Sequence, residues 1–169
     1  MASSSALDFI TVKGFKSIAS LEKVGLRPIN VLIGANGSGK SNFIEVFSFL
    51  HAVREGRLQD YVRKAGGAEQ LLHFGSKVTE KITIRISFQQ EVNQYDLSLK
   101  PTEDDSLYAS SEWVYFWDKS RGFSSPIGQD LLPRESGREA GISSPNVTRI
   151  SGWVRLRLGS WRVYHMHDT

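Results

Sequence analysis

The chain of 169 residues is long enough for one domain with a proper core, and its hydrophobic content of 40% and charged content of 23% are ordinary for a globular protein. The absence of cysteine excludes disulfides and thiolate metal sites, and neither a signal-peptide pattern nor an apolar run of membrane-spanning length is found, so a cytoplasmic protein without membrane contact is expected. A formal net charge of +3 permits a nucleic-acid partner without requiring one.

The N-terminal part of the chain predicts two antiparallel strands followed by a buried one. Residues 8–15 alternate apolar and polar side chains, and residues 18–24 form a second run of strand type. Pro28 then marks a turn, and Ile29–Ile33 is a short, continuously apolar run. This run is typical of a buried strand.

A glycine-rich loop motif, Gly-x-x-x-x-Gly-Lys-Ser, follows the apolar run. Glycine allows successive backbone N–H groups to curl around an anion, and the N-terminus of the helix expected next adds partial positive charge. Lys40 would reach the β- and γ-phosphates of a nucleotide, and the Ser41 hydroxyl would bind Mg²⁺. The pattern therefore predicts a nucleoside triphosphate site. The predicted contacts are Gly34, Ala35, Asn36, Gly37, Ser38, Gly39, Lys40, Ser41 and Asn42.

The middle of the chain predicts helices and then an antiparallel meander. A helix is expected from Ser41 to about Val53, with an apolar stripe formed by Phe43, Ile44, Phe47 and Leu50. A short helix over Arg57–Ala65 and a helical or irregular segment over residues 68–74 follow. The expected strands are Lys81–Phe88, Val92–Leu99 and Leu107–Trp117.

The C-terminal part of the chain predicts a loop, a helix and a strand. Residues 118–143 are rich in Gly, Ser, Pro and charge, which is typical of a long flexible loop. Ser144-Pro145 has the pattern of an N-cap followed by proline at the first helical position, and apolar residues keep helical spacing up to Gly159. Trp161–His167 is expected to form a closing strand.

The order of these elements resembles the N-terminal lobe of the ATP-binding-cassette heads in RecF, structural-maintenance-of-chromosomes and OLD-like ATPases. Val12–Ile18 and Ile29–Glu45 carry this resemblance. Gly66–Gly75 and Ser160–Thr169 further resemble bacterial AAA-type ATPases that are often found near DNA-repair or phage-defence genes. The resemblance implies an α/β P-loop NTPase fold with an antiparallel β meander. It also implies that residues 1–169 form a single lobe and that the C-terminal lobe of such a head is absent.

The resemblance also implies ligands, partners and a mechanism. Two heads would sandwich ATP and Mg²⁺ between the glycine-rich loop of one and the signature motif of the other, so that ATP binding closes a homodimer and hydrolysis reopens it. DNA would be the distal partner. The alternative is a non-catalytic nucleotide-binding or regulatory module of a larger assembly. A small P-loop kinase or GTPase is a third possibility, opposed by the N-terminal strands and by the lack of an Asn-Lys-x-Asp motif.

Catalytic residues are not assigned by the sequence. Trp113–Asp118 places apolar residues before an acid, but Lys119 stands where the catalytic Glu of such heads would be. Glu135–Arg138 is a poor match to a signature motif. On its own, the chain is therefore expected to bind nucleotide without efficient turnover.

Several positions have two interpretations each. Lys16 is either a nucleotide contact from the N-terminal turn or a solvated lysine, and Asn36 is either a γ-phosphate contact or a residue suited to a left-handed backbone. In the resembling heads the strand that leaves this lobe leads to a Mg²⁺ contact. This implies that His167 or Asp168 lies near the metal; the alternative is a plain strand end, and a zinc site at His165, His167 and Asp168 is disfavoured.

Arginine and tryptophan side chains also have two interpretations. The arginines of the C-terminal part are either DNA phosphate contacts or a cover for the surface on which a second lobe docks: Arg149, Arg155, Arg157 and Arg162. The tryptophans are either stacking platforms for nucleic-acid bases or core residues, and the core interpretation is favoured: Trp113, Trp117, Trp153 and Trp161.

Overall fold

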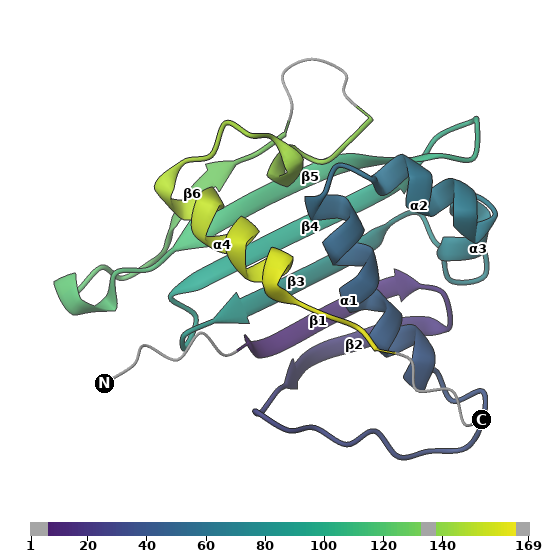
Figure 1. Cartoon of the computed structure of the whole chain (residues 1–169), viewed down its shortest axis with the longest axis horizontal. Coiled ribbons are helices and arrows are strands. Elements are labelled where there is room, and N and C mark those ends of the chain that lie inside the picture. Colours follow the sequence, from purple (N-terminus) through teal and green to yellow (C-terminus); the bar gives the residue numbers. More distant parts are fainter. Residues whose placement is uncertain (1–6, 133–137, 165–169) are drawn as a thin grey trace.

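A single antiparallel sheet with helices on one face organises the protein, in a computed structural model that describes residues 7–132 and 138–164 (Figure 1). The strands are β1 Leu7–Phe15, β2 Ile18–Gly25, β3 Ile82–Phe88, β4 Asn93–Pro101, β5 Leu107–Phe116 and β6 Ile127–Asp130, in the order β2-β1-β3-β4-β5-β6. The helices are α1 Lys40–Arg54, α2 Leu58–Ala65, α3 Ala68–Leu71 and α4 Arg149–Ser160. The 3-10 turns are η1 Lys119–Arg121 and η2 Gly141–Ser143.

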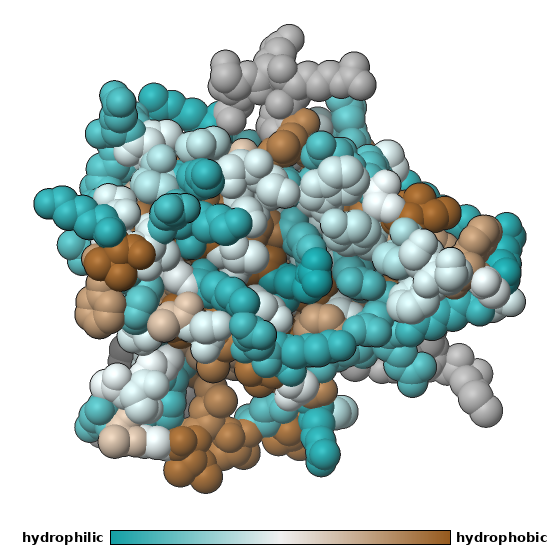
Figure 2. Space-filling view, turned by 180° about the vertical axis from the view of Figure 1, so that it is seen from behind, coloured by the Kyte–Doolittle hydropathy of each residue, from teal (hydrophilic) through white to brown (hydrophobic). Residues whose placement is uncertain are grey.

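The antiparallel pattern predicted for the strands is confirmed. In β3, Ile82, Ile84 and Ile86 are fully buried under the helices, whereas Thr83 and Arg85 lie on the opposite face. This alternation arises because successive side chains of a strand point to opposite faces of the sheet. Figure 2 shows the opposite, uncovered side of the molecule, which is mostly hydrophilic. The core therefore lies between one face of the sheet and the helices. No helix in the described part of the chain is both long and apolar enough to cross a membrane.

The helix after the glycine-rich loop is confirmed, but its buried face differs from the predicted stripe. Phe43 and Leu50 face the sheet as expected, together with Val46, Phe49 and Val53. Ile44 and Phe47 were predicted on the same stripe, but Ile44 is exposed and Phe47 is half-buried. Helix α1 thus carries apolar side chains on two sides, which is typical of a helix covered by more than one layer.

The predicted buried strand Ile29–Ile33 is wrong for this structure. These residues form an extended segment that pairs with no strand in the described chain, and Ile29 and Ile33 are 84% and 91% exposed. A strand needs a neighbour for its backbone hydrogen bonds, and the nearest sheet edge, β2, pairs only with β1. In Figure 1 the segment runs below the sheet, away from the other elements. In Figure 2 it appears as the brown group at the lower edge.

Three predictions for the C-terminal part also need correction. The predicted loop 118–143 contains strand β6 and the turns η1 and η2. Helix α4 begins at Arg149 rather than at Pro145, because Thr148 and Ser151 form a reciprocal capping box, and it continues through Gly159 to Ser160. Residues 161–164 of the predicted closing strand form no strand, and residues 165–167 lie outside the described residues.

A buried carboxylate joins the sheet to the segment that precedes α4. Glu112 on β5 is fully buried, and its Oε1 accepts hydrogen bonds from the Tyr95 hydroxyl at 2.8 Å and the Ile142 backbone N–H at 2.9 Å. Its Oε2 accepts a third from the Gly141 backbone N–H at 2.6 Å. Burial raises the pKa of Glu112, and these donors partly offset the rise. Glu112 therefore anchors turn η2 to the sheet.

Replacing this carboxylate should destabilise the fold. In Glu112→Ala, the Gly141 and Ile142 N–H groups and the Tyr95 hydroxyl lose their acceptor inside the protein. Because a buried polar group without a partner costs about 1–3 kcal/mol, we expect the free energy of unfolding to fall by about 3 kcal/mol or more. Chemical denaturation measures this. The control Glu103→Ala, at an exposed site, should change stability by about 0.5 kcal/mol or less, and equal effects of the two changes would contradict the anchoring role.

Candidate functional site

The glycine-rich loop lies between the exposed run Ile29–Ile33 and the first turn of α1. Gly37 and Gly39 have φ angles of +82° and +90°, in the left-handed region that glycine adopts without steric cost. A Cβ at Gly39 would lie 2.9 Å from the Ser17 Oγ, whereas a Cβ at Gly37 would meet nothing within 4 Å. The backbone conformation of this loop therefore depends on glycine at both positions, and on close approach to the turn between β1 and β2 only at Gly39.

Lys40 holds the glycine-rich loop together. Its ammonium Nζ donates to the backbone carbonyls of Gly34 and Ala35, each at 2.7 Å, and lies 3.4 Å from the Ser38 Oγ. These are neutral acceptors, and no carboxylate in the described residues forms an ion pair with this lysine. The Lys40 ammonium can therefore exchange its hydrogen bonds to the two carbonyls for contacts with an anionic ligand.

The N-terminus of α1 is chemically suited to an anion. Its N-cap is Gly39, no side chain caps it, and no acidic residue lies in its first turn. The first backbone N–H groups of a helix have no partner within the helix, so they are open to a ligand. Helix α4 differs, because Thr148 and Ser151 cap its N-terminus. The chain thus leaves uncapped the helix end that follows the glycine-rich loop.

The turn between β1 and β2 joins this helix end to the sheet. Asn42 donates from Nδ2 to the Ser17 Oγ at 2.7 Å. Lys16 forms an ion pair with Glu45 on α1, and the Tyr61 hydroxyl donates to the same Glu45 Oε1 at 2.8 Å. Burial first, and then the contact with Glu45, raise the pKa of Tyr61. Lys16 therefore lies close to the site, but its charge is engaged by Glu45.

A hollow of about 480 Å³ separates the glycine-rich loop from β2. Ser17 and Leu21 line it on one side, and Gly34, Lys40 and Phe43 line it on the other. This volume falls within the range of small-molecule pockets. Ser17, Glu45 and Tyr61 belong to this site but carry no motif of their own in the sequence. Ser17 and Glu45 lie within the two resembling stretches, which was the available signal, whereas only the folded structure brings Tyr61 to Glu45.

The remaining sequence candidates lie elsewhere. Asp118, at the rejected acidic motif, is paired with Arg121 and accepts from Ser120, and both contacts lower its pKa. His165, His167 and Asp168 lie outside the described residues, as do residues 135–137 of the poor signature match. Within the described chain, no group of three or more His, Asp or Glu side chains is placed to hold a metal ion.

Most of the C-terminal arginines and tryptophans are engaged in contacts within the chain. Arg155 donates to the Ser144 carbonyl at 2.5 Å, and the Arg157 guanidinium lies 4.9 Å from the centre of the Trp153 ring. Trp153 packs edge-on against Phe88 at 5.4 Å. Trp161 is partly buried and packs against the surface of the hydrophobic core. The core interpretation therefore accounts for the packing of Trp153 and of Trp161, both of which are partly buried.

Comparison with known proteins places the chain in a family. Residues 29–168 match the family described as "AAA domain, putative AbiEii toxin, Type IV TA system". The chain is 30% identical over 91 residues to the DNA replication and repair protein RecF of Lacticaseibacillus casei, covering 54% of this chain and 22% of that protein. The RecF of Renibacterium salmoninarum is 35% identical over 89 residues, or 52% of this chain and 22% of that protein.

A chromosome partition protein is also similar. The Smc protein of Thermoplasma acidophilum is 38% identical over 73 residues, which are 39% of this chain and 6% of that protein. The matched part thus spans less than a quarter of the length of each of these relatives. No solved structure matches the chain significantly.

The two left-handed glycines of the loop allow a paired test of its geometry. Gly37→Ala should cost about 1–2 kcal/mol of unfolding free energy, because alanine is strained at a positive φ. Gly39→Ala should cost more, because the added methyl group also meets the Ser17 Oγ. Chemical denaturation of both variants measures the difference. In a Ser17→Ala background the excess at Gly39 should disappear, and an unchanged excess would contradict the observed approach of the loop to the β1–β2 turn.

Proposed function

The chain belongs to the AAA-domain family matched by residues 29–168 and is an N-terminal lobe of RecF/SMC type, and from this premise we propose that it binds Mg²⁺-ATP at residues 34–42. The uncapped N-terminus of α1, with the Lys40 ammonium resting on neutral carbonyls, is the observation that carries the proposal. The helix N–H groups and Lys40 would hold the phosphates. The exposed Ser41 hydroxyl, which no described residue engages, would hold Mg²⁺.

Lys16 is also part of the proposed ATP site, as a lysine that is paired with Glu45 and could move to a phosphate. Its ammonium pairs with Glu45 beside the first turns of α1. To reach a phosphate, Lys16 would have to leave Glu45, which would remain hydrogen-bonded to Tyr61. Nucleotide binding would then be coupled to the contact between the β1–β2 turn and α1.

The proposed context is a cytoplasmic ATPase of RecF/SMC type that acts on or near DNA. The similar RecF proteins are named for DNA replication and repair, and the similar Smc protein for chromosome partition. In this context the chain would meet a second ATPase head, and ATP would join the two. A role in phage defence is part of the same proposal, since the matched family is described by a toxin–antitoxin system. A non-catalytic nucleotide-binding module is the alternative, because no Asp or Glu is among the described residues that line the hollow beside the loop.

The exposed run Ile29–Ile33 supports docking of a C-terminal lobe. The run and the outer side of α1 face each other across a hollow of about 620 Å³ lined by apolar side chains such as Val31, Ile44 and Phe47. Both sides are apolar, and a contiguous apolar surface of this kind is typical of an interface. We propose that a strand of the second lobe pairs with this run and covers α1.

Removing the lysine of the loop should weaken ATP binding. A charge-assisted hydrogen bond contributes about 1.5–3 kcal/mol, so Lys40→Ala should lower the affinity for Mg²⁺-ATP about tenfold or more. Isothermal titration calorimetry measures this. The control Lys81→Ala removes an exposed lysine elsewhere and should leave the affinity unchanged. Equal affinities of the Lys40→Ala and parent chains would remove the site assignment.

Charging the exposed run should abolish docking without unfolding the chain. Ile29→Asp with Ile33→Asp alters side chains that are almost fully exposed, so the melting temperature should change little. Co-purification with a separately expressed C-terminal lobe should be lost, because two carboxylates would be buried at the interface. Val78→Asp makes the same change at an exposed site on another loop and should retain co-purification. Retention by the double variant would contradict the docking proposal.

A further inference from the structure

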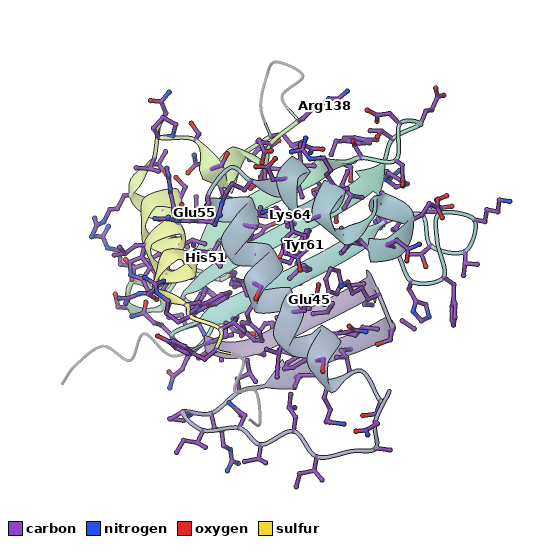
Figure 3. All side chains as sticks on the ribbon, turned by 45° about the vertical axis from the view of Figure 1, so that its right-hand side comes forward. Glu45, His51, Glu55, Tyr61, Lys64 and Arg138 are labelled. Carbon is purple, nitrogen blue, oxygen red and sulfur yellow. The ribbon has the colours of Figure 1, made fainter. Side chains whose placement is uncertain are left out.

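A third hollow lies far along α1 from the glycine-rich loop. It has a volume of about 390 Å³ and is formed by α1, α2 and residues 161–163 that follow α4. His51 of α1 lines it, eleven residues after Lys40. At about 1.5 Å per residue, this separation is roughly 16 Å along the helix. Figure 3 shows His51 on α1 and Tyr61 and Lys64 on α2, on the helix-covered side of the molecule. The hollow is therefore separate from the proposed ATP site.

Positive charge gathers at this hollow. Arg57, Lys64 and Arg162 line it, and all three are exposed. Asp60 is the one carboxylate among the lining residues, and Arg63, outside the hollow, already pairs with it. Within the described chain, the three cations form no ion pair, whereas Lys13, Lys16, Lys23, Arg54 and Arg85 each pair with an acid. The hollow thus has excess cationic charge, because its one carboxylate is already paired with Arg63.

Aromatic side chains form the deeper wall of the same hollow. Phe47, Tyr61 and Trp161 line it and are half-buried, in contrast to the exposed cations. The Phe47 and Trp161 rings meet edge-on with centroids 5.2 Å apart. His51 adds a polar group: its Nδ1 lies 3.3 Å from the Leu158 carbonyl, to which it donates. The wall is therefore suited to a flat ring and the rim to an anion.

The size of the hollow selects among anions. A single water occupies about 30 Å³ in the liquid, and the hollow has a volume of about 390 Å³. It therefore has room for a ligand several times larger than an inorganic phosphate. An aromatic wall below a cationic rim fits a ligand with both a ring and a phosphate. An acidic peptide would use the rim but leave the aromatic wall without a matching group.

We propose that this hollow binds a nucleotide unit, with the phosphate held by Arg57, Lys64 and Arg162 and the base packed against Trp161. This nucleotide unit could come from either of two ligands, a free mononucleotide or a single-stranded nucleic acid, because both present a base and a phosphate. Bases stack on aromatic side chains without much sequence preference, and a cationic groove follows the backbone. The proposal does not require ATP at the glycine-rich loop.

Binding is measured by fluorescence polarisation of a fluorescein-labelled fifteen-nucleotide oligo(dT), and by calorimetry with uridine monophosphate. Both probes are applied to the intact chain and to the Lys40→Ala chain, so that binding at the glycine-rich loop is separated. Arg57→Ala with Lys64→Ala should weaken the binding of whichever probe binds at least roughly tenfold in both backgrounds. For oligo(dT), loss of two phosphate contacts should also reduce the salt dependence of the binding constant by about 1.4 in log–log slope.

The matched control is Lys77→Ala with Lys81→Ala, which removes the same charge from two exposed lysines outside the hollow. This control should retain binding, and both double variants should keep the parent melting temperature. Calorimetry with Mg²⁺-ATP should give the double variant at the hollow the parent's ATP affinity, so that failure of this site and of the ATP site are distinguished.

The outcomes separate the source of the ligand from the validity of the proposal. Binding of either oligo(dT) or uridine monophosphate that is lost only in the Arg57/Lys64 variant supports it, and the probe that binds identifies the source. An equal loss in the control would mean non-specific charge and would overturn it. Binding of a polyglutamate peptide at this site with no binding of either nucleotide probe would also overturn it, and would identify an acidic peptide as the occupant.

Discussion

A β-strand cannot satisfy its own backbone hydrogen bonds. This constraint determines whether the segment before the glycine-rich loop is paired or exposed, and so how the loop is supported. The five-stranded part from β1 to β5 satisfies it through continuous antiparallel pairing. The run Ile29–Ile33 has the apolar composition of a strand but no neighbour, so it stays extended and exposed. The glycine-rich loop is consequently supported from one side only, by α1 and the β1–β2 turn.

That one-sided support explains how the loop keeps its geometry. Asn42 and Ser17 tie the first turn of α1 to the β1–β2 turn, and Glu45 ties Lys16 to the same helix. The β1–β2 turn is held in place from its other side, because the His73 Nδ1 lies 2.7 Å from the Lys16 carbonyl and the Lys16 N–H donates to the Leu71 carbonyl at 2.7 Å. The site is thus built on the β1–β2 turn. This turn connects two strands of the sheet and contacts α1 on one side and the segment around α3 on the other.

Elements whose sequence signal is local match the structure, and elements with more than one possible signal differ from it. The period-two alternation of Lys81–Phe88 and the helix after the loop were predicted correctly, because both depend on neighbours within a few residues. The start of α4 was missed because Ser144-Pro145 and Thr148–Ser151 are both plausible caps, and only the structure shows that Thr148 makes the reciprocal contacts. The buried face of α1 was misjudged because the helix is apolar on two sides, so its spacing fits more than one stripe.

The sequence by itself determined the glycine-rich loop, the lysine within it and the helix that follows, since these depend on residue type at fixed spacing. It also indicated the antiparallel pair at the N-terminus and the strands of the meander, through alternation within each strand, whereas the pairing of β1 with β3 that joins them was decided by the tertiary structure. Only the tertiary structure decided that Glu45 would take the charge of Lys16 and that Arg162 would join Arg57 and Lys64 at one hollow, because Glu45 is distant in sequence from Lys16 and Arg162 is distant from α2. The exposure of Ile29–Ile33 was likewise a tertiary outcome: composition shows that a segment can form a buried strand, but the presence of a partner strand decides whether it does.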